Sequence, residues 1–198
     1  AKNYLFSRGF TKDDFYLHKP GISRSNEFIN RIIFPSFDSE LKLNFFVSRT
    51  YDDNQKIKYR NCKANKKEVI FNENMVDFNS ELVLVEGIFD LVNVERNCCC
   101  ILGSWLDHNY VLFEKIVKNK TPIILALDPD AEMKARKIAR MLKEYCVEVK
   151  IVDKLQSDIG SMSKNEVETA LLSAKHYDNT DRLRYLIDGI KSGSVYWG

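Results

Sequence analysis

The segment Leu82-Val-Leu-Val-Glu86-Gly87-Ile-Phe-Asp90 decides the fold of this chain. Its first four residues are aliphatic, a pattern typical of a short strand buried on both faces of a parallel sheet. Glu86 follows at the carboxyl end of that strand, and Gly87 allows a sharp backbone turn directly after it. The segment therefore predicts a buried strand that ends in an acidic turn and leads into a helix over 89–96.

A regular alternation of strands and helices continues from this segment towards the C-terminus. Further strands are expected over 99–102, 122–127 and 147–152, and helices over 109–118, 131–145, 164–174 and 181–191. Such alternation predicts right-handed crossovers and a parallel sheet.

The first 80 residues have a different character. Aromatic-rich stretches at 31–35 and 43–47 predict short strands of a small mixed α+β subdomain. The expected fold class is therefore α/β, with a parallel sheet flanked by helices and preceded by this basic subdomain. The expected domains are 1–80, 81–175 and a C-terminal helix with a tail over 176–198.

Acidic residues follow three of the predicted strands: Glu86, Asp90, Asp128, Asp130 and Asp158. The carboxyl ends of parallel strands share one edge of a sheet, so these side chains are expected to converge. Converging carboxylates repel one another unless a cation compensates them. Because Mg²⁺ prefers oxygen ligands and bridges carboxylates to substrate phosphates, we predict a Mg²⁺ (or Mn²⁺) site here. For any single residue the alternative is a turn acid or a helix cap.

The composition excludes several classes of protein. The chain has 198 residues, of which 44% are hydrophobic and 29% are charged, as in ordinary globular proteins. No apolar run approaches the roughly 20 residues that span a bilayer, so no membrane partner is expected. The five cysteines include no C-x-x-C pair, which argues against a disulfide framework and against a zinc site in this chain. Free buried thiols and a cytoplasmic location are the expectation.

The net charge of +2 conceals an uneven distribution of charge along the chain. Between residues 49 and 67 there are seven Lys or Arg and two Asp, which gives this segment a balance of +5. Basic residues interleaved with an aromatic residue and amides are typical of a surface that contacts phosphates and bases. On composition alone, the alternative is a solvated basic face.

The Glu86-Gly87 turn and the Asp128-x-Asp130 motif resemble the TOPRIM fold, and the order of motifs narrows the resemblance. It is the order found in the RNA polymerase core of DnaG-like primases from bacteria and phages: Arg31-Ile-Ile-Phe-Pro35, Phe46-Val-Ser-Arg49, Lys58-Tyr59-x-Asn61, then Glu86-Gly-x-x-Asp90. The opening Tyr4-Leu5-x-x-Arg8-Gly9-Phe10 and the turn Leu102-Gly103-Ser104 also resemble that family. The similarity extends from about residue 4 to about residue 175.

This resemblance implies template-directed synthesis of short RNA primers during DNA replication, by metal-dependent nucleotidyl transfer. The implied catalytic acids are Glu86, Asp128 and Asp130, and the implied metal ligands are these three with Asp90 and Asp158. The residues implied to contact nucleotide phosphates or template are Arg31, Arg49, Lys58, Tyr59 and Asn61. The implied partners are a single-stranded DNA template, ribonucleoside triphosphates, a replicative helicase, and a zinc-binding module or another chain that supplies one.

Two departures from the family pattern favour a divergent, phage-type member. Where the family often has Asp-Pro-Asp after the fourth strand, this chain has Asp158-Ile159-Gly160, so one expected acid is absent. A basic residue that often follows the Lys-Tyr-x-Asn stretch is also absent, and Phe71-Asn72-Glu73 occupies that region. Because the resemblance begins so near the first residue, we expect the core of a longer or divided polymerase.

The sequence leaves two other functions open. A TOPRIM nuclease would use the same acids for hydrolysis, although it has no evident need for the Lys58-Tyr59-x-Asn61 segment. A non-catalytic, single-stranded DNA-binding subunit of the replisome is the non-enzyme hypothesis, and the glycine at position 160 supports it. A topoisomerase is less favoured, because its strand-cleaving Tyr requires a further domain.

Overall fold

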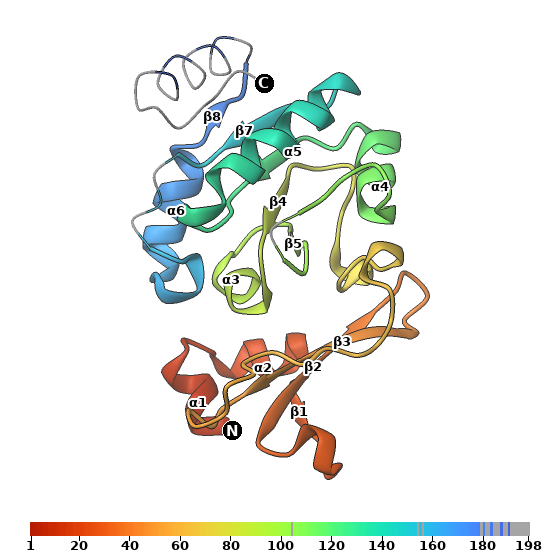
Figure 1. The fold of residues 1–198 in the computed structure, drawn as a ribbon, viewed down its shortest axis with the longest axis vertical. Helices are drawn as coiled ribbons and strands as arrows, with labels where there is room; N and C mark the ends of the chain where they lie inside the picture. The colour runs from red at the N-terminus through yellow and green to blue at the C-terminus, as the bar shows by residue number, and fades with distance from the viewer. Residues whose placement is uncertain are drawn as a thin grey trace.

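The computed structural model describes residues 1–103, 105–153, 155, 157–178, 180, 183, 187 and 190. These residues form a three-stranded sheet near the N-terminus and a five-stranded sheet in the remainder of the chain (Figure 1). The helix and tail expected over 181–198 lie outside the described residues, apart from three isolated positions. Ser104, the last residue of the expected turn at 102–104, also lies outside them.

Two short helices and an antiparallel sheet make up the N-terminal part. The helices are α1 (Lys2–Ser7) and α2 (Lys12–His18), and the strands are β1 (Gly21–Ile22), β2 (Arg31–Phe37) and β3 (Leu43–Thr50). The strands expected at 31–35 and 43–47 are confirmed, and each extends further than expected.

The basic segment continues this small sheet. Residues 58–62 run antiparallel beside β3, because the N–H of Arg60 donates to the carbonyl of Ser48 at 2.9 Å and the N–H of Thr50 donates to the carbonyl of Lys58 at 3.0 Å. Tyr59 is thereby paired with Arg49 across the two segments. Side chains in extended segments alternate between faces, so this pairing fixes which basic residues share a face.

The larger sheet has the strand order β5-β4-β6-β7-β8. Its strands are β4 (Leu82–Val85), β5 (Cys98–Cys100), β6 (Ile123–Leu125), β7 (Val149–Ile151) and β8 (Lys175–His176). The first four are parallel, which confirms the expected α/β class, and β8 is antiparallel to β7. The sequence did not predict β8, since its two exposed residues carry no hydrophobic pattern.

Four further helices and five short 3₁₀ turns complete the part of the chain that the structure describes. The helices are α3 (Ile88–Asn93), α4 (Val111–Asn119), α5 (Glu132–Glu144) and α6 (Lys164–Leu172). The turns are η1 (Asn26–Phe28), η2 (Lys66–Glu68), η3 (Glu73–Met75), η4 (Pro129–Ala131) and η5 (Ile159–Ser161). The helix expected over 89–96 is shorter than expected, because the backbone becomes extended at Val94.

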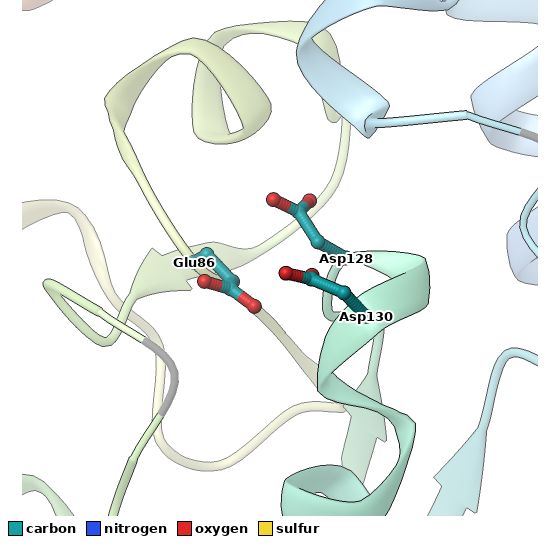
Figure 2. Close-up of side chains that lie close together, drawn as sticks. All are labelled: Glu86, Asp128 and Asp130. Atoms are coloured by element: carbon teal, nitrogen blue, oxygen red, sulfur yellow. The ribbon is translucent and has the colours of Figure 1, made fainter.

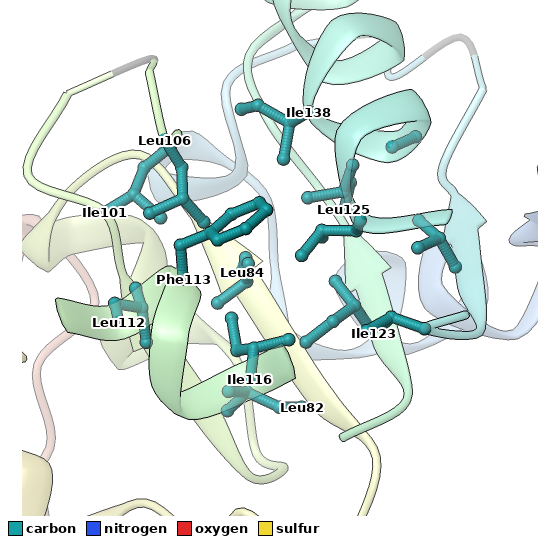
Figure 3. Close-up of a cluster of buried hydrophobic side chains, with 14 of the residues drawn as sticks. Leu82, Leu84, Ile101, Leu106, Leu112, Phe113, Ile116, Ile123, Leu125 and Ile138 are labelled. Carbon is teal, nitrogen blue, oxygen red and sulfur yellow. The ribbon is translucent and has the colours of Figure 1, made fainter. Parts of the chain in front are cut away.

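Strand β4 is buried on both faces, as its aliphatic run predicts. Leu82 and Leu84 face one core together with residues of α4 and α5 (Figure 3). Val83 and Val85 face a second core that includes residues of α3, of α6 and of the N-terminal part. The sheet therefore lies between two apolar layers, and its carboxyl edge is held in place from both sides.

Aromatic rings join the small sheet to the larger one. Phe10, Phe34 of β2 and Phe89 of α3 form a cluster with ring centroids 5.7 to 6.0 Å apart. This cluster belongs to the second core, so residues from both sides of position 80 share one apolar layer. The small sheet is thereby packed against the helix that carries Asp90. The division of the chain at residue 80 stays a prediction.

All five cysteines are free, and Cys99 and Cys100 are buried as expected. Cys62 and Cys98 are half-buried and Cys146 is exposed in the turn that follows α5, which corrects the expectation of buried thiols for these three. Over the described part of the chain, none of the helices combines the length and the apolar character that crossing a bilayer requires.

Candidate active site

The carboxyl ends of β4 and β6 bring three acids together. Glu86 directly follows β4, and Asp128 and Asp130 lie at the start of η4, after β6. One carboxylate oxygen from each of the three lies within 4.8 Å of the other two. Figure 2 shows Asp128 and Asp130 extending from the same turn, with Asp130 directed towards Glu86. The convergence expected from the parallel sheet is present.

A second acidic group shares Asp128 with the first. Asp90 of α3, Asp128 and Asp158, which precedes η5, also have carboxylate oxygens within 4.8 Å of one another. The five acids named from the sequence therefore form two adjacent groups of three, with Asp128 in both. Each group offers the hard oxygen donors that Mg²⁺ takes.

The backbone holds the carboxylate of Asp90 at both ends. Oδ2 accepts a hydrogen bond from the N–H of Gly87 at 2.8 Å, and Oδ1 accepts one from the N–H of Gly160 at 2.9 Å. The side chain is 7% exposed. Burial raises the pKa of Asp90 well above its usual range, and the neighbouring carboxyl of Asp158 raises it further. Asp90 is thus a fixed carboxyl whose negative charge is costly without a cation.

Gly160 occupies the position where the family pattern led us to expect an acid. A Cβ at this position would lie 3.0 Å from Oδ1 of Asp90, 3.1 Å from Cβ of Phe89 and 3.2 Å from Oδ1 of Asp158. A side chain at 160 would therefore displace the carboxylates that form the second acidic group. Glycine at this position thus accommodates the close approach of Asp90.

The acids at this edge of the sheet carry more charge than the nearby Lys134 offsets, since the pKa of Glu86 stays raised beside that lysine. Oε1 of Glu86 is buried and has no hydrogen-bond partner among the described residues. Burial, followed by the charge of Asp128, raises the pKa of Glu86. Burial, followed by the charges of Asp158 and Asp130, raises the pKa of Asp128 to about 6. An orphaned buried oxygen and three carboxyls with raised pKa values fit a divalent cation bound to these residues.

A basic and aromatic pair lies close to the acids. The guanidinium carbon of Arg49 lies 4.8 Å from the centroid of the Tyr59 ring, and its Nε donates to the hydroxyl of Tyr4 at 3.2 Å. Burial raises the pKa of Tyr59 to about 12; the charge of Arg49 opposes this rise and that of Asp90 adds to it. Tyr59 is therefore within electrostatic range of both Arg49 and Asp90, and its hydroxyl stays protonated at neutral pH.

The other three residues expected to contact nucleotide or template are placed differently. Lys58 and Asn61 are exposed, and within the described part of the chain neither side chain has a hydrogen-bond or ion-pair partner. Arg31 is 4% exposed and pairs with Thr50, whereas Ile32 pairs with Arg49, so Arg31 and Arg49 are on opposite faces of the small sheet. The structure therefore does not bring Arg31 together with the Arg49–Tyr59 pair.

Two basic residues near the site were not among those selected from the sequence. The guanidinium of Arg8 lies 4.8 Å from the ring centroid of Phe89, the neighbour of Asp90. Lys134 of α5 lies close enough for its charge to lower the pKa of Glu86. Arg8 could have been found, since it belongs to the Tyr-Leu-x-x-Arg-Gly motif at the start of the chain. Lys134 carries no such signal, because the helical pattern of α5 makes it an ordinary exposed position.

The chain matches several solved structures in fold. The Aquifex aeolicus primase, with zinc-binding and RNA polymerase domains, superposes with a TM-score of 0.77 at 19% identity, over 89% of this chain and 56% of that one. A DnaG primase catalytic domain bound to single-stranded DNA gives a TM-score of 0.71 at 15% identity, over 88% of this chain and 71% of that one. The primase fragment of the bacteriophage T7 primase-helicase protein gives 0.62 at 15% identity, over 85% and 72%.

Comparisons of sequence add nothing to these matches, since no protein-family model and no curated protein matches the chain. This chain spans a little over half the length of the Aquifex protein, 56%. Identities of 15 to 19% define the fold rather than the activity. The chain has the fold of the DnaG-type primase catalytic core, including its TOPRIM-type sheet.

Proposed function

We propose that this chain is the catalytic core of a DnaG-type DNA primase. It would join ribonucleotides on a single-stranded DNA template by metal-dependent nucleotidyl transfer. The observation that carries the proposal is the pair of acidic groups that share Asp128, within electrostatic range of the Arg49–Tyr59 pair and in the fold of a primase core. Fold alone would not be sufficient, because one fold supports many activities.

The acids would hold Mg²⁺ (or Mn²⁺) in the two groups described above. An ion bound there would stabilise the charge that develops on the attacking and leaving oxygens during transfer. In this proposal Glu86, Asp128 and Asp130 act as the catalytic acids, and Asp90 and Asp158 complete the ligand set. The N–H groups of Gly87 and Gly160 hold the carboxylate of Asp90 in place. This carboxylate would therefore need little rearrangement to bind a metal ion.

The basic residues would position the phosphates of a nucleotide or of the template. Arg49 has its guanidinium against the Tyr59 ring, and among the described residues its side chain donates one hydrogen bond, from Nε, so its terminal N–H groups can donate to a phosphate. The protonated hydroxyl of Tyr59 can donate a hydrogen bond. Lys58 and Asn61 add an exposed cation and an exposed amide in the same segment. Positioning and electrostatics provide most of the catalysis in phosphoryl transfer, so the site needs no nucleophilic side chain.

The similar proteins support the proposed partners. One is described with a zinc-binding domain, one is bound to single-stranded DNA and one is a fragment of a primase-helicase. We therefore propose a single-stranded DNA template and ribonucleoside triphosphates as substrates. A replicative helicase and a zinc-binding module are the proposed protein partners.

The test is ribonucleotide incorporation in the presence of Mg²⁺ or Mn²⁺. A short RNA already annealed to a DNA template should be used as well as single-stranded DNA alone, because extension does not require the initiation step that the proposed zinc-binding partner would support. Wild type should extend the RNA. The activity of Asp128→Asn should be at least about 100-fold lower, because Asp128 belongs to both acidic groups. Glu144→Gln, at the exposed far end of α5, is the matched control and should retain it.

The same preparation separates the primase from its two competitors. Metal-dependent cleavage of DNA without nucleoside triphosphates, lost in Asp128→Asn, would replace this proposal with a TOPRIM nuclease. DNA binding that needs no metal, with neither synthesis nor cleavage, would favour a non-catalytic subunit. The feature that supported the latter hypothesis, glycine at 160, leaves a complete group of three acids in place.

A further inference from the structure

Helix α3 presents two polar side chains to the turn η5, which lies between β7 and α6. Asp90 and Asn93 are three positions apart on α3, so they lie on the same face of the helix. Asp90 accepts the hydrogen bond from the N–H of Gly160 described above. Asn93 was not among the residues selected from the sequence, because a single amide within an apolar helix gives no sign of its partners. In the structure it faces the same turn as Asp90.

The side-chain amide of Asn93 binds two backbone carbonyls of this turn. Its Nδ2 donates to the carbonyl of Ile159 at 2.9 Å and to the carbonyl of Met162 at 3.0 Å. Carbonyl oxygens only accept hydrogen bonds, so both contacts require the nitrogen of the amide on this side. Ile159 is the first residue of η5 and Met162 directly follows its last, so the amide holds both ends of the turn.

The surroundings of Asn93 leave this amide little freedom. The residue is 5% exposed, and a Cβ built at Gly9 would lie 3.6 Å from its Oδ1, so the turn after α1 covers the other side of the amide. The side chain of Ile159 is buried in the second core. The turn η5 is therefore fixed against α3 by an apolar side chain and by the two hydrogen bonds from Asn93.

The position of η5 determines where two of the acids lie. The N–H of Gly160, in the middle of the turn, lies 2.9 Å from Oδ1 of Asp90 and 2.8 Å from Oδ1 of Asp158. Asp158 directly precedes the turn, and its carbonyl accepts a hydrogen bond from the N–H of Ser161 at 2.9 Å. A displacement of η5 would therefore change the separation of the two carboxylates. These carboxylates repel one another when no cation is bound, so the turn must be held from outside the pair.

We propose that Asn93 is a positioning residue for the second acidic group. By holding η5 against α3, it keeps Asp90 and Asp158 at the separation at which both, with Asp128, can bind one Mg²⁺. Asn93 itself does not contact the ion. Groups that orient the ligands of a metal ion commonly change its affinity by roughly 10- to 100-fold when they are removed. The inference rests on the metal site of the proposed function.

The test measures Mn²⁺ affinity directly, from the electron paramagnetic resonance signal of the unbound ion, without nucleotides or DNA. Asn93→Leu has a similar size and shape and removes both donors. Asn97→Leu is the matched control, because Nδ2 of Asn97 also donates to backbone carbonyls, those of Asp77 at 2.6 Å and Glu81 at 3.2 Å, where β4 begins. Asn93→Ala adds no bulk and provides the same comparison if the leucine variant does not fold.

The substitutions are compared in two backgrounds that separate the acidic groups. Glu86→Gln leaves the second group intact, and Asp158→Asn leaves the first group intact. With Glu86→Gln, Asn93→Leu should bind Mn²⁺ roughly tenfold more weakly than Asn97→Leu. With Asp158→Asn, the two should bind Mn²⁺ equally, because the ligand that Asn93 positions is no longer there.

A merely structural role of Asn93 would weaken binding in both backgrounds alike. An equal loss in both, or no loss with Glu86→Gln, would therefore show that the proposal is wrong. The proposed polymerase activity is judged separately, by extension of an annealed RNA. If the expected pattern of Mn²⁺ affinities is found but wild type incorporates no ribonucleotide, the role of Asn93 stands and the polymerase proposal fails. If wild type extends the RNA but the Asn93 variants bind Mn²⁺ as the control does, the reverse holds.

Discussion

The N–H of Gly160 donates to Oδ1 of Asp90 at 2.9 Å, although the two residues are 70 positions apart in the sequence. The same N–H lies 2.8 Å from Oδ1 of Asp158. One backbone group thus fixes two carboxylates of the second acidic group, and it can do so only because nothing projects from the α-carbon of residue 160. A Cβ at this position would approach both carboxylates and Phe89 more closely than side chains ordinarily do.

Gly160→Ala should therefore destabilise the protein. The new Cβ would lie 3.0 Å from Oδ1 of Asp90 and 3.1 Å from Cβ of Phe89, and Phe89 belongs to the rigid second core. Overpacking of this kind costs about 1–3 kcal/mol, which urea denaturation followed by circular dichroism would measure.

Gly21→Ala is the matched control for that prediction. No atom lies within 4 Å of a Cβ built at Gly21, so the free energy of unfolding should change by less than about 0.5 kcal/mol. Equal effects of the two substitutions would show that close approach to Asp90 is not what constrains residue 160.

The sequence was sufficient to predict the four parallel strands of the larger sheet and the acidic residues, but neither β8 nor the arrangement of the basic residues. The aliphatic run at 82–85 has one interpretation, a strand buried on both faces, and the position of Glu86 at its carboxyl end follows from sheet geometry. The faces of Arg31 and Arg49 could not be assigned, because the register between β2 and β3 decides them and a shift of one residue reverses every side chain. The reason for glycine at 160 depends on a contact between distant residues, which no local pattern contains.

Asp128→Asn should stabilise the metal-free protein at neutral pH. The folded-state pKa of Asp128 is raised from 3.8 to about 6, so between these values the folded chain binds more protons than the unfolded chain. The free energy of unfolding therefore falls as the pH rises through this window, and the asparagine variant lacks that loss. Because the side chain is partly exposed, the gain is on the order of 1 kcal/mol, measurable by urea denaturation in EDTA at pH 7.5.

Glu144→Gln should show no such gain, since Glu144 is exposed and remote from the other acids. Repeating both measurements at pH 4 provides a second check, because the difference between Asp128→Asn and wild type should shrink once Asp128 is protonated in the folded state. A difference that is independent of pH would assign the effect to packing and would contradict the electrostatic explanation.

Binding of Mg²⁺ should strengthen as the pH rises from about 5 to about 8. Glu86, Asp90 and Asp128 all have raised pKa values, so a cation must displace protons from them at the lower pH. The rise in melting temperature caused by added MgCl₂ should be larger at pH 8 than at pH 5.5, and absent in Asp128→Asn at both. An equal rise at both pH values would indicate that the ion binds elsewhere.

Arg49→Lys should impair use of the nucleotide or template without affecting metal binding. A lysine retains the charge but has no planar group to lie against Tyr59 and no fork for a phosphate. Ribonucleotide incorporation should fall at least about tenfold, which corresponds to roughly 1.4 kcal/mol of lost stabilisation, while stabilisation by MgCl₂ stays as in wild type. Tyr59→Phe keeps the ring beneath the guanidinium and loses only the hydroxyl, so its loss should be smaller. If Arg49→Lys extends RNA as well as wild type, charge alone is sufficient at this position and the stacked geometry has no role in positioning the substrate.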